Sequence, residues 1–542
     1  MRAPRLPSER AYTLASAALF PVLGLFVALP LAGAFMPLFR GDGAFDNLGR
    51  AFGDARFLGS FGFGLGQALA SAVLALLVGL PGAYLLGRKK FPGKRLLSAL
   101  AVVPFCVPPL IVALGFVLYY GKDGFLNRAL MAMFSLDRPP LDFLYSFWGV
   151  VLAHGFYNFP LVMSMAGDAW SGIRRDTEDA ARLLGAGRVR TFVTVTLPGI
   201  LPAAGAAFTL TFLMCFFSFT IVLLFGGPGV GTPEVELYRA ARFDLDRPLA
   251  SAFALVESAV ALLALYAYAR LERRVSGRRT DAARREAAVP FRGPAGVAGA
   301  VVYGLLVLVA FLGPLAAVAG ESLVVRSAKY GPGNLGLGNY LALFSSPSFV
   351  RAAGNTLALG LGSALLAALI GFALSLALKR TRSPFLASVL PLSPLALSSV
   401  VLAYGWSSVV GTATPLTLAA VQAVSAYPFI LKGIQGALGS SDERLADAAL
   451  ALGSSRLGAV FRVRLPLAAP ALLSGFAFAF AISAGDANAL IAAPVPGYET
   501  LALKLYQLAG SYRFNEACAA ATLLGLAVSL VFFLKDGRHA IA

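Results

Sequence analysis

The sequence predicts an all-α membrane protein with twelve transmembrane helices arranged as two parallel six-helix repeats. Three observations support this fold class: the composition, the spacing of long apolar runs and an internal repeat. Of the 542 residues, 58% are hydrophobic and 13% are charged, and the mean hydropathy is +0.76. A soluble domain usually has about 45–50% apolar and about 25% charged residues. The composition therefore excludes a water-soluble fold.

Twelve apolar segments are long enough to be membrane helices, since a crossing needs about 20 residues. They are 13–35, 62–86, 96–119, 147–169, 198–225, 249–269, 296–319, 353–378, 386–409, 416–431, 467–491 and 516–534. The tenth segment is the weakest, because it is short and contains Tyr427 and Pro428.

The basic residues predict the orientation of these spans. With a cytoplasmic N-terminus, the inside segments hold 31 of the 45 Lys and Arg residues and the outside segments hold 14. Such an excess predicts a multi-pass protein of the cell inner membrane with both termini in the cytoplasm. Because the basic residues stand in short clusters such as Arg88-Lys89-Lys90, the net charge of +18 indicates contact with membrane lipid rather than with nucleic acid.

An internal repeat relates the two halves of the chain at an offset of 268 residues. Residues 179–198 and 447–466 both consist of Asp-Ala-Ala, three residues, a glycine, eleven residues and Leu-Pro. The matched residues are Asp179, Ala180, Ala181, Gly185, Leu197 and Pro198 in the first copy, and Asp447, Ala448, Ala449, Gly453, Leu465 and Pro466 in the second. We call these segments the first and second cassettes.

The repeat defines the expected organisation of the chain. Upstream, Gly64-Leu65-Gly66 matches Gly360-Leu361-Gly362 at an offset of 296, which fits a longer outside loop in the first half (about 120–146) than in the second (about 410–415). The halves are then 1–269 and 295–542, joined by an Arg-rich cytoplasmic linker, 270–294. Six spans per half is an even number, so both halves insert in the same orientation and the repeats are parallel.

Each cassette is expected to form a short helix on the inner membrane surface. Alanines favour the helix, the glycine can end it, and the proline suits the first turn of the following span. A short helix joined rigidly to a span can transmit a push from a cytoplasmic partner.

At these residues the chain resembles the ABC-importer permeases, whose EAA loop the cassettes match with Asp179 and Asp447 in place of the usual Glu. The resemblance extends over nearly the whole chain and is closest to the fused permeases of the thiamine and ferric-iron importers. Segments 218–248 and 499–524 look most like the thiamine permease. The resemblance implies a type I ABC importer permease fold, two copies of an ATPase subunit on the cassettes and an extracytoplasmic solute-binding protein.

Enzymatic and metal chemistry are not expected in this chain. The sequence has no G-x-x-x-x-G-K-[ST] loop to hold a nucleotide phosphate. ATP and Mg are therefore expected on partner subunits, with no cofactor bound here. Two histidines and three scattered cysteines, Cys106, Cys215 and Cys518, also predict no metal site.

Polar residues within the spans are candidates for a substrate pathway, because ionisable groups in hydrocarbon cost several kcal/mol without a cavity or partner. The candidates are His154, Asn158, Ser218, Thr220, Glu257, Asp486 and Asn488. For a cationic solute, Asp486 and Glu257 are the best attractors. The alternative interpretation is a polar contact between helices that fixes their packing.

Several functions remain open on the sequence alone. Within the importer class, the cargo could be thiamine, ferric iron or a polyamine. A secondary transporter with two six-span halves would share the parallel repeat but couple transport to ions. A lipid-handling or structural membrane protein is the third alternative. A stably bound ATPase subunit distinguishes the importer from the other two classes.

Overall fold

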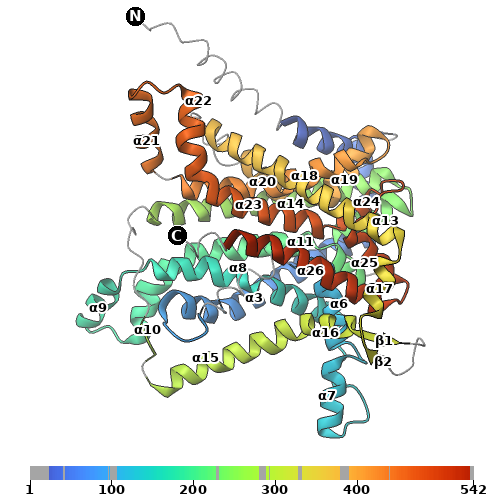
Figure 1. The fold of residues 1–542 in the computed structure, drawn as a ribbon, viewed down its shortest axis with the longest axis horizontal. Coiled ribbons are helices and arrows are strands. Elements are labelled where there is room, and N and C mark those ends of the chain that lie inside the picture. Colours follow the sequence, from blue (N-terminus) through green and yellow to red (C-terminus); the bar gives the residue numbers. More distant parts are fainter. Residues whose placement is uncertain are drawn as a thin grey trace, which may run out of the picture. The chain divides into compact units, whose positions relative to one another are not determined.

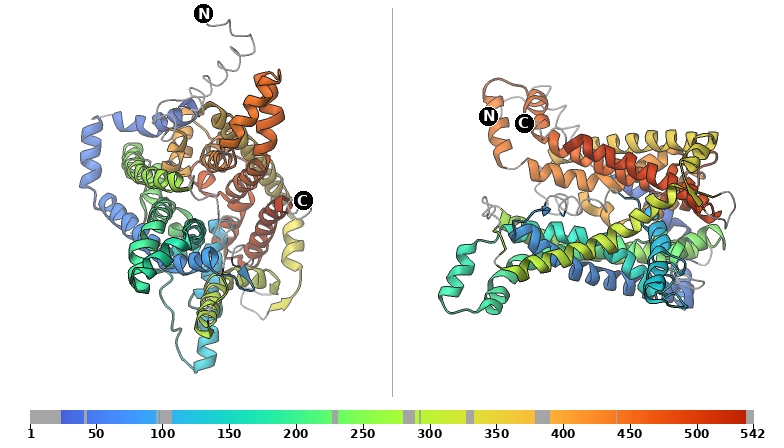
Figure 2. Two further views of the ribbon diagram at one scale, coloured as in Figure 1. Left: turned by 90° about the vertical axis from the view of Figure 1, so that its left-hand side faces the viewer. Right: turned by 60° about the horizontal axis from the view of Figure 1, so that its bottom comes forward.

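The computed structural model describes residues 24–536, except 41–42, 95–96, 98–106, 227–230, 280–288, 292, 327–332, 379–389 and 439. The chain forms two compact units. The first-half unit comprises residues 45–341 and 512–522, and the second-half unit comprises 1–44, 342–511 and 523–542. Each unit thus combines segments that are far apart in the sequence. Figures 1 and 2 show that the chain is built almost entirely of helices.

The first-half unit contains most of the helices before residue 341. They are α2 (Ala44–Gly53), α3 (Ala55–Arg88), α6 (Pro109–Tyr120), α7 (Phe125–Phe134), α8 (Phe147–Ser171), α9 (Arg175–Leu183), α10 (Arg188–Thr191), α11 (Leu197–Phe216), α12 (Thr220–Phe225), α13 (Pro233–Arg242), α14 (Arg247–Arg279), α15 (Pro294–Val307) and α16 (Gly313–Ser322). Two short strands, β1 (Val324–Arg326) and β2 (Gly333–Leu335), pair antiparallel with Val324 opposite Leu335.

The second-half unit contains the corresponding helices of the second repeat. They are α17 (Gly338–Phe344), α18 (Pro347–Leu378), α19 (Ser399–Val410), α20 (Pro415–Ala437), α21 (Ser440–Ala451), α22 (Arg456–Ala459), α23 (Leu465–Gly485), α24 (Asn488–Ala492) and α25 (Leu501–Gly510). The last helix, α26 (Phe514–Asp536), contributes residues to both units.

Ten helices in the described part of the chain are long and apolar enough to cross a membrane. They correspond to the second through eighth and the tenth through twelfth predicted spans. Residues 13–23 of the first predicted span lie outside the described residues. The described part is a helix, Gly24–Phe39, which is followed by α2 at a bend of 82°. If these two helices are counted together as one broken span, the described residues contain eleven spans.

The ninth predicted span, 386–409, is the main departure from the expected twelve. Its described part is a 3-10 turn, Leu390–Ala396, followed by α19, which at 12 residues is too short to cross alone. Pro391 and Pro394 account for the irregular start, because proline lacks the N–H that a continuous helix needs. Residues 386–389 of this span, and residues 96 and 98–106 of the third span, lie outside the described residues.

Two predicted spans are broken near one end, which corrects the expectation of continuous helices over 198–225 and 467–491. The first is divided into α11 and α12, and the second into α23 and α24. At the second break, Asp486 Oδ1 accepts the backbone N–H groups of Asn488 (2.9 Å) and Ala489 (3.4 Å). Short polar side chains compete in this way with the helical hydrogen-bond pattern.

Close packing of α3 on α8 forms the centre of the first-half unit. A Cβ on Gly79 would lie 2.7 Å from the carbonyl oxygen of Phe159, and a Cβ on Gly87 would lie 2.7 Å from that of Gly167. Glycines at such contacts let two membrane helices approach closely, where van der Waals packing replaces the hydrophobic driving force.

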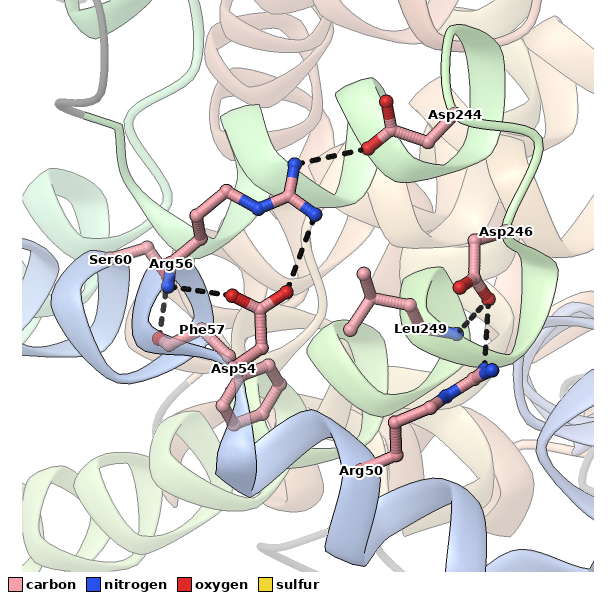
Figure 3. A network of polar contacts seen from close by, with 8 residues as sticks. All are labelled: Arg50, Asp54, Arg56, Phe57, Ser60, Asp244, Asp246 and Leu249. Atoms are coloured by element: carbon pink, nitrogen blue, oxygen red, sulfur yellow. Dashed lines mark hydrogen bonds and ion pairs between the residues drawn. The ribbon is translucent and has the colours of Figure 1, made fainter.

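A network of ion pairs joins the starts of α3 and α14 (Figure 3). Asp54 accepts the backbone N–H of Arg56 (2.8 Å), and the Arg56 guanidinium reaches Asp244 at 3.3 Å. The Asp246 carboxylate accepts hydrogen bonds from the backbone N–H of Leu249 (3.0 Å) and from the side chain of Arg50 (3.3 Å). Asp54 and Asp246 thus cap the N-termini of α3 and α14, where negative charge is favoured. Arg56 links the first cap to Asp244, and Arg50 pairs with the second cap.

The longer outside loop expected in the first half, 120–146, contains α7. Asn127, which is fully buried, holds this loop closed: its Nδ2 donates to the carbonyl oxygens of Gly121 and Leu141 (both 2.8 Å), and its Oδ1 accepts the N–H of Leu141 (2.9 Å). In the second half, only four residues separate α19 from α20, as the short loop predicted there requires.

In the second-half unit, the helix Gly24–Phe39 packs on α19, although more than 350 residues separate them. The rings of Phe26 and Trp406 lie 6.3 Å apart, edge to face. A Cβ on Gly33 would clash with the backbone carbonyl oxygen of Gly405 in α19, so only glycine permits this approach.

Candidate functional site

The two cassettes have the same backbone structure, residue for residue at the 268-residue offset. The glycines that follow α9 and α21 have left-handed φ angles, +85° at Gly185 and +87° at Gly453. In each cassette, the glycine N–H donates to the carbonyl oxygen of the residue three positions before the glycine. The N–H of the residue after the glycine donates to the carbonyl oxygen of the residue five positions before itself. This pair of bonds is the Schellman motif, which requires a left-handed residue and therefore favours glycine. The predicted helix-ending role of both glycines is confirmed.

The second part of each cassette differs from the prediction, because it is helical and continuous with the span. A π-helical turn, Phe192–Thr196 or Val460–Arg464, joins α10 to α11 and α22 to α23. The N–H of Leu197 donates to the carbonyl oxygen of Phe192, five residues back, and Leu465 does the same to Val460.

The prolines therefore lie ten residues inside a longer helix, which begins at Arg188 or Arg456, rather than at its start. Pro198 and Pro466 have no N–H to complete a regular helix at this point, and the π turn accommodates them. As a result, each glycine turn is followed by one unbroken helical rod that includes a membrane span. Figure 1 shows α9 projecting beyond the end of α8, and α21 standing beside the start of the α22–α23 rod.

Apolar side chains are exposed at matching positions of both cassettes. Leu184 and its counterpart Leu452 are each 89% exposed, directly before the glycine. Val193 and its counterpart Phe461 are also exposed, one turn before the span proper. Large apolar side chains exposed in a charged region are typical of a protein–protein contact surface.

The cassette acids are exposed as well. Asp179 forms an ion pair with Arg182 at 3.2 Å in which both side chains are more than half exposed, and Asp447 is exposed on α21. Exposed ion pairs contribute little to stability, typically 0–1 kcal/mol. Both carboxylates are therefore available to a partner at small cost.

Three of the predicted pathway residues meet in one buried polar node of the first-half unit. Nδ1 of His154 lies 2.9 Å from Oε1 of Gln67, and Nε2 lies 2.7 Å from Oγ of Ser218. Because the Gln67 oxygen can only accept, the network assigns the proton to Nδ1, and Ser218 donates to Nε2. Asn158 donates to the carbonyl oxygen of His154 (2.9 Å) and to Sγ of Cys215 (3.4 Å).

A second polar node occupies the second-half unit. Oγ of Ser363 donates to Oε1 of Gln422 at 3.1 Å, and the Ser483 hydroxyl donates to the same oxygen. Nε2 of Gln422 donates to the carbonyl oxygen of Ser483 (3.3 Å), and its side chain also interacts with Asp486.

The two nodes are built from equivalent positions of the repeat. The 268-residue offset aligns His154 with Gln422, Cys215 with Ser483 and Ser218 with Asp486, and the 296-residue offset aligns Gln67 with Ser363. Sequence reasoning identified only part of each node, since Gln67, Ser363, Gln422 and Ser483 were not among its candidates. Applying the offset to His154 would have found Gln422.

The remaining pathway candidates are Glu257, Thr220 and Asn488. Glu257, on α14, is fully buried beside Glu234 of α13, and the two carboxyl groups interact. Thr220 is buried at the start of α12, and Asn488 begins α24, where its N–H binds Asp486. Within the described residues, no three His, Cys, Asp or Glu side chains are grouped to hold a metal ion.

The fold and the cassettes together define a class of protein: a helical membrane protein made of two repeats, each presenting an exposed helix–turn on a rod that enters the membrane. A family model, "Binding-protein-dependent transport system inner membrane component", matches residues 79–277 and 340–541. The chain belongs to this family.

Two curated relatives cover most of the chain, and a third covers less than half of it. A thiamine transport system permease protein, ThiP, of Brucella abortus is 29% identical over 550 residues, covering 98% of this chain and 97% of its own length. ThiP of Salmonella typhimurium is 27% identical and covers 88% of this chain and 89% of its own length. A putative 2-aminoethylphosphonate transport system permease protein, PhnU, of Salmonella typhi is 34% identical over 240 residues, covering 44% of this chain and 81% of its own length.

Family membership gives the general function. The chain is the permease subunit of a binding-protein-dependent importer and a multi-pass inner membrane protein. It translocates its cargo and is not an enzyme. ATPase subunits and a substrate-binding protein are its partners, as the family requires.

Proposed function

We propose that this permease imports thiamine or its phosphates, that both its termini are cytoplasmic, and that each cassette binds one of two ATPase copies that carry ATP and Mg. The similarity to two thiamine permeases over nearly the full chain supports the cargo. The matched pair of exposed cassettes supports the ATPase stoichiometry, because each cassette presents the same leucine, glycine turn and acid. That pair of cassettes is the single observation on which the mechanism rests.

The cassette geometry explains how motion reaches the membrane. The exposed Leu184 and Leu452 enter the ATPase surface. The left-handed glycines fix the angle between each docking helix, α9 or α21, and the continuous helix that follows it, α10–α11 or α22–α23. When ATP draws the ATPase subunits together, α11 and α23 change tilt because no flexible joint separates them from the glycine turn. The permease itself contributes two conformations of similar energy, which ATP, cargo and binding protein populate differently.

Reconstitution tests the cargo and the energy source together. The permease, its ATPase and its binding protein are placed in proteoliposomes, and uptake of labelled thiamine is measured with and without ATP. Thiamine uptake that depends on both partners supports the proposal. ATP-independent uptake, or uptake of ferric iron, a polyamine or 2-aminoethylphosphonate in place of thiamine, contradicts it.

A labelling experiment tests the orientation separately. The experiment uses a Cys106→Ser background, in which the two remaining cysteines, Cys215 and Cys518, are buried. A Leu184→Cys or Leu452→Cys variant should react with a membrane-impermeant maleimide only after the cell membrane is opened. Labelling in intact spheroplasts would place the cassettes on the outer side of the membrane and would contradict the proposal that they bind the ATPase subunits.

A further inference from the structure

One acid of α9, directly before the first cassette, points inward, unlike the exposed Asp176 and Asp179 on the same helix. Glu178 Oε1 accepts from Nη2 of Arg88, at the end of α3, at 2.8 Å. The same oxygen accepts the hydroxyl of Thr196, in the π turn before α11, at 2.7 Å. A single carboxylate therefore connects α9, the end of α3 and the start of the α11 rod.

This ion pair is shielded from water. The side chains of Arg88 and Glu178 are 7% and 15% exposed, whereas those of Arg174 and Asp176, which also pair at the start of α9 at 3.0 Å, are 73% and 78% exposed. Nη1 of Arg88 is buried without a hydrogen-bond partner, so Glu178 supplies the charge that balances the guanidinium. Breaking a buried pair by removing one partner is strongly unfavourable, while breaking an exposed pair has little effect.

The end of the linker between the halves is attached at the same place. Val289 donates its N–H to the carbonyl oxygen of Arg88 (3.0 Å), and Lys90 donates its N–H to that of Val289 (2.8 Å). The Lys89 ammonium lies 5.4 Å from the ring centre of Phe291. Nearby, Lys94 donates to the carbonyl oxygen of Lys89 (3.1 Å), and burial lowers the pKa of its ammonium.

The second repeat has no acid at the position of Glu178. The repeat aligns Glu178 with Ala446, which is buried on α21, and Thr196 with Arg464. An alanine side chain cannot accept a hydrogen bond or balance a guanidinium. The backbones of the two cassettes are alike, but their attachment to neighbouring elements differs at this position.

We infer that the two cassettes are mechanically different. In the first half, Glu178, Arg88 and Thr196 form a set of contacts, here called the lock, that fixes α9 to α3 as well as to α11. The second cassette transmits motion without an equivalent carboxylate. Glu178 is thus a positioning residue for coupling. This inference rests on the proposed function for its role in transport, but the lock itself is a property of the permease alone. One ATPase copy then moves α3 and α11 together, through the first cassette.

Hydrogen–deuterium exchange on the purified permease in nanodiscs tests the lock without any ATPase. Glu178→Gln should raise exchange over residues 175–191 at least tenfold and leave 443–459 unchanged. Asp176→Asn is the matched control, because it removes an exposed acid two residues away, and it should change neither region. Thr196→Val, which keeps the ion pair, should give a smaller increase, about threefold, and remains informative if Glu178→Gln does not fold.

The complete transporter tests the role in coupling. With ATPase and binding protein present, Glu178→Gln should lower the ratio of cargo transported to ATP hydrolysed at least fivefold, while Asp176→Asn keeps it. Unchanged exchange in both Glu178→Gln and Thr196→Val, or an equal rise in both cassettes, would overturn the lock. An altered exchange pattern in a permease that binds no ATPase would support the lock and contradict the proposed function instead.

Discussion

Replacing the cassette glycines by alanine tests the coupling model directly, because the expected cost can be worked out from the backbone alone. At Gly185 and Gly453, φ is +85° and +87°, and nothing lies within 4 Å of an added Cβ at either position. A methyl group therefore causes no clash, and the whole penalty is the left-handed conformation, roughly 1–2 kcal/mol for an L-residue.

That penalty converts to a measurable loss of affinity. Since about 1.4 kcal/mol corresponds to a factor of ten, each Gly→Ala change should weaken ATPase binding roughly 5- to 30-fold. Asparagine tolerates the left-handed region better, so Gly→Asn should lose less than Gly→Ala. The assay is a titration of purified ATPase onto the permease in nanodiscs, with insertion and yield measured alongside.

Gly187 provides the matched control for this experiment. It lies two residues after Gly185, also with open space around its Cβ position, but its φ is −66°. Gly187→Ala should therefore leave ATPase binding nearly unchanged. Equal losses for Gly185→Ala and Gly187→Ala, or no loss for either cassette glycine, would refute the conformational argument.

Other changes have equally specific outcomes. Leu184→Asp or Leu452→Asp should each weaken ATPase binding at least tenfold in the same titration, since a buried leucine contributes about 1.5–3 kcal/mol and an aspartate at that position would be desolvated. His154→Ala should lower the free energy of unfolding by about 2–5 kcal/mol, because Gln67 and Ser218 lose buried partners, whereas His154→Gln, the residue at the equivalent repeat position, should lose less in a thermal unfolding series. Glu257→Gln should keep thiamine uptake within twofold and raise the melting temperature; a tenfold loss of uptake with an intact fold would instead show that Glu257 attracts the cargo.

The sequence predicts the cassettes well because their signal is local and doubled. The spacing of Asp179, Gly185 and Pro198 repeats at Asp447, Gly453 and Pro466, and both glycines prove to be left-handed. Local rules for helix ends are sufficient for that result. The same rules missed the π turns, because proline's missing N–H can be accommodated inside a helix as well as at its start.

Features that depend on distant partners could not be predicted in this way. Glu178 is one of several acids in α9, and the sequence of this nine-residue helix does not show that Glu178 pairs with Arg88, which lies 90 positions earlier in the chain. Gln67 appears in the sequence as one polar residue within an apolar run, although it binds His154. Hydropathy also measures apolarity rather than helix continuity, so the breaks after α11 and α23 were not foreseen.

The pairing of the helix Gly24–Phe39 with α19 has a consequence for how the protein is made. About 360 residues are synthesised between these two segments, which takes about 20 to 70 s at 5–20 residues per second. Throughout that interval, the apolar surface around Phe26 and Gly33 has no native neighbour. Membrane insertion of this chain therefore depends on lipid or an insertase to shelter its earliest segment until nearly three-quarters of the polypeptide exists. Truncated translation products should for this reason be short-lived in the membrane.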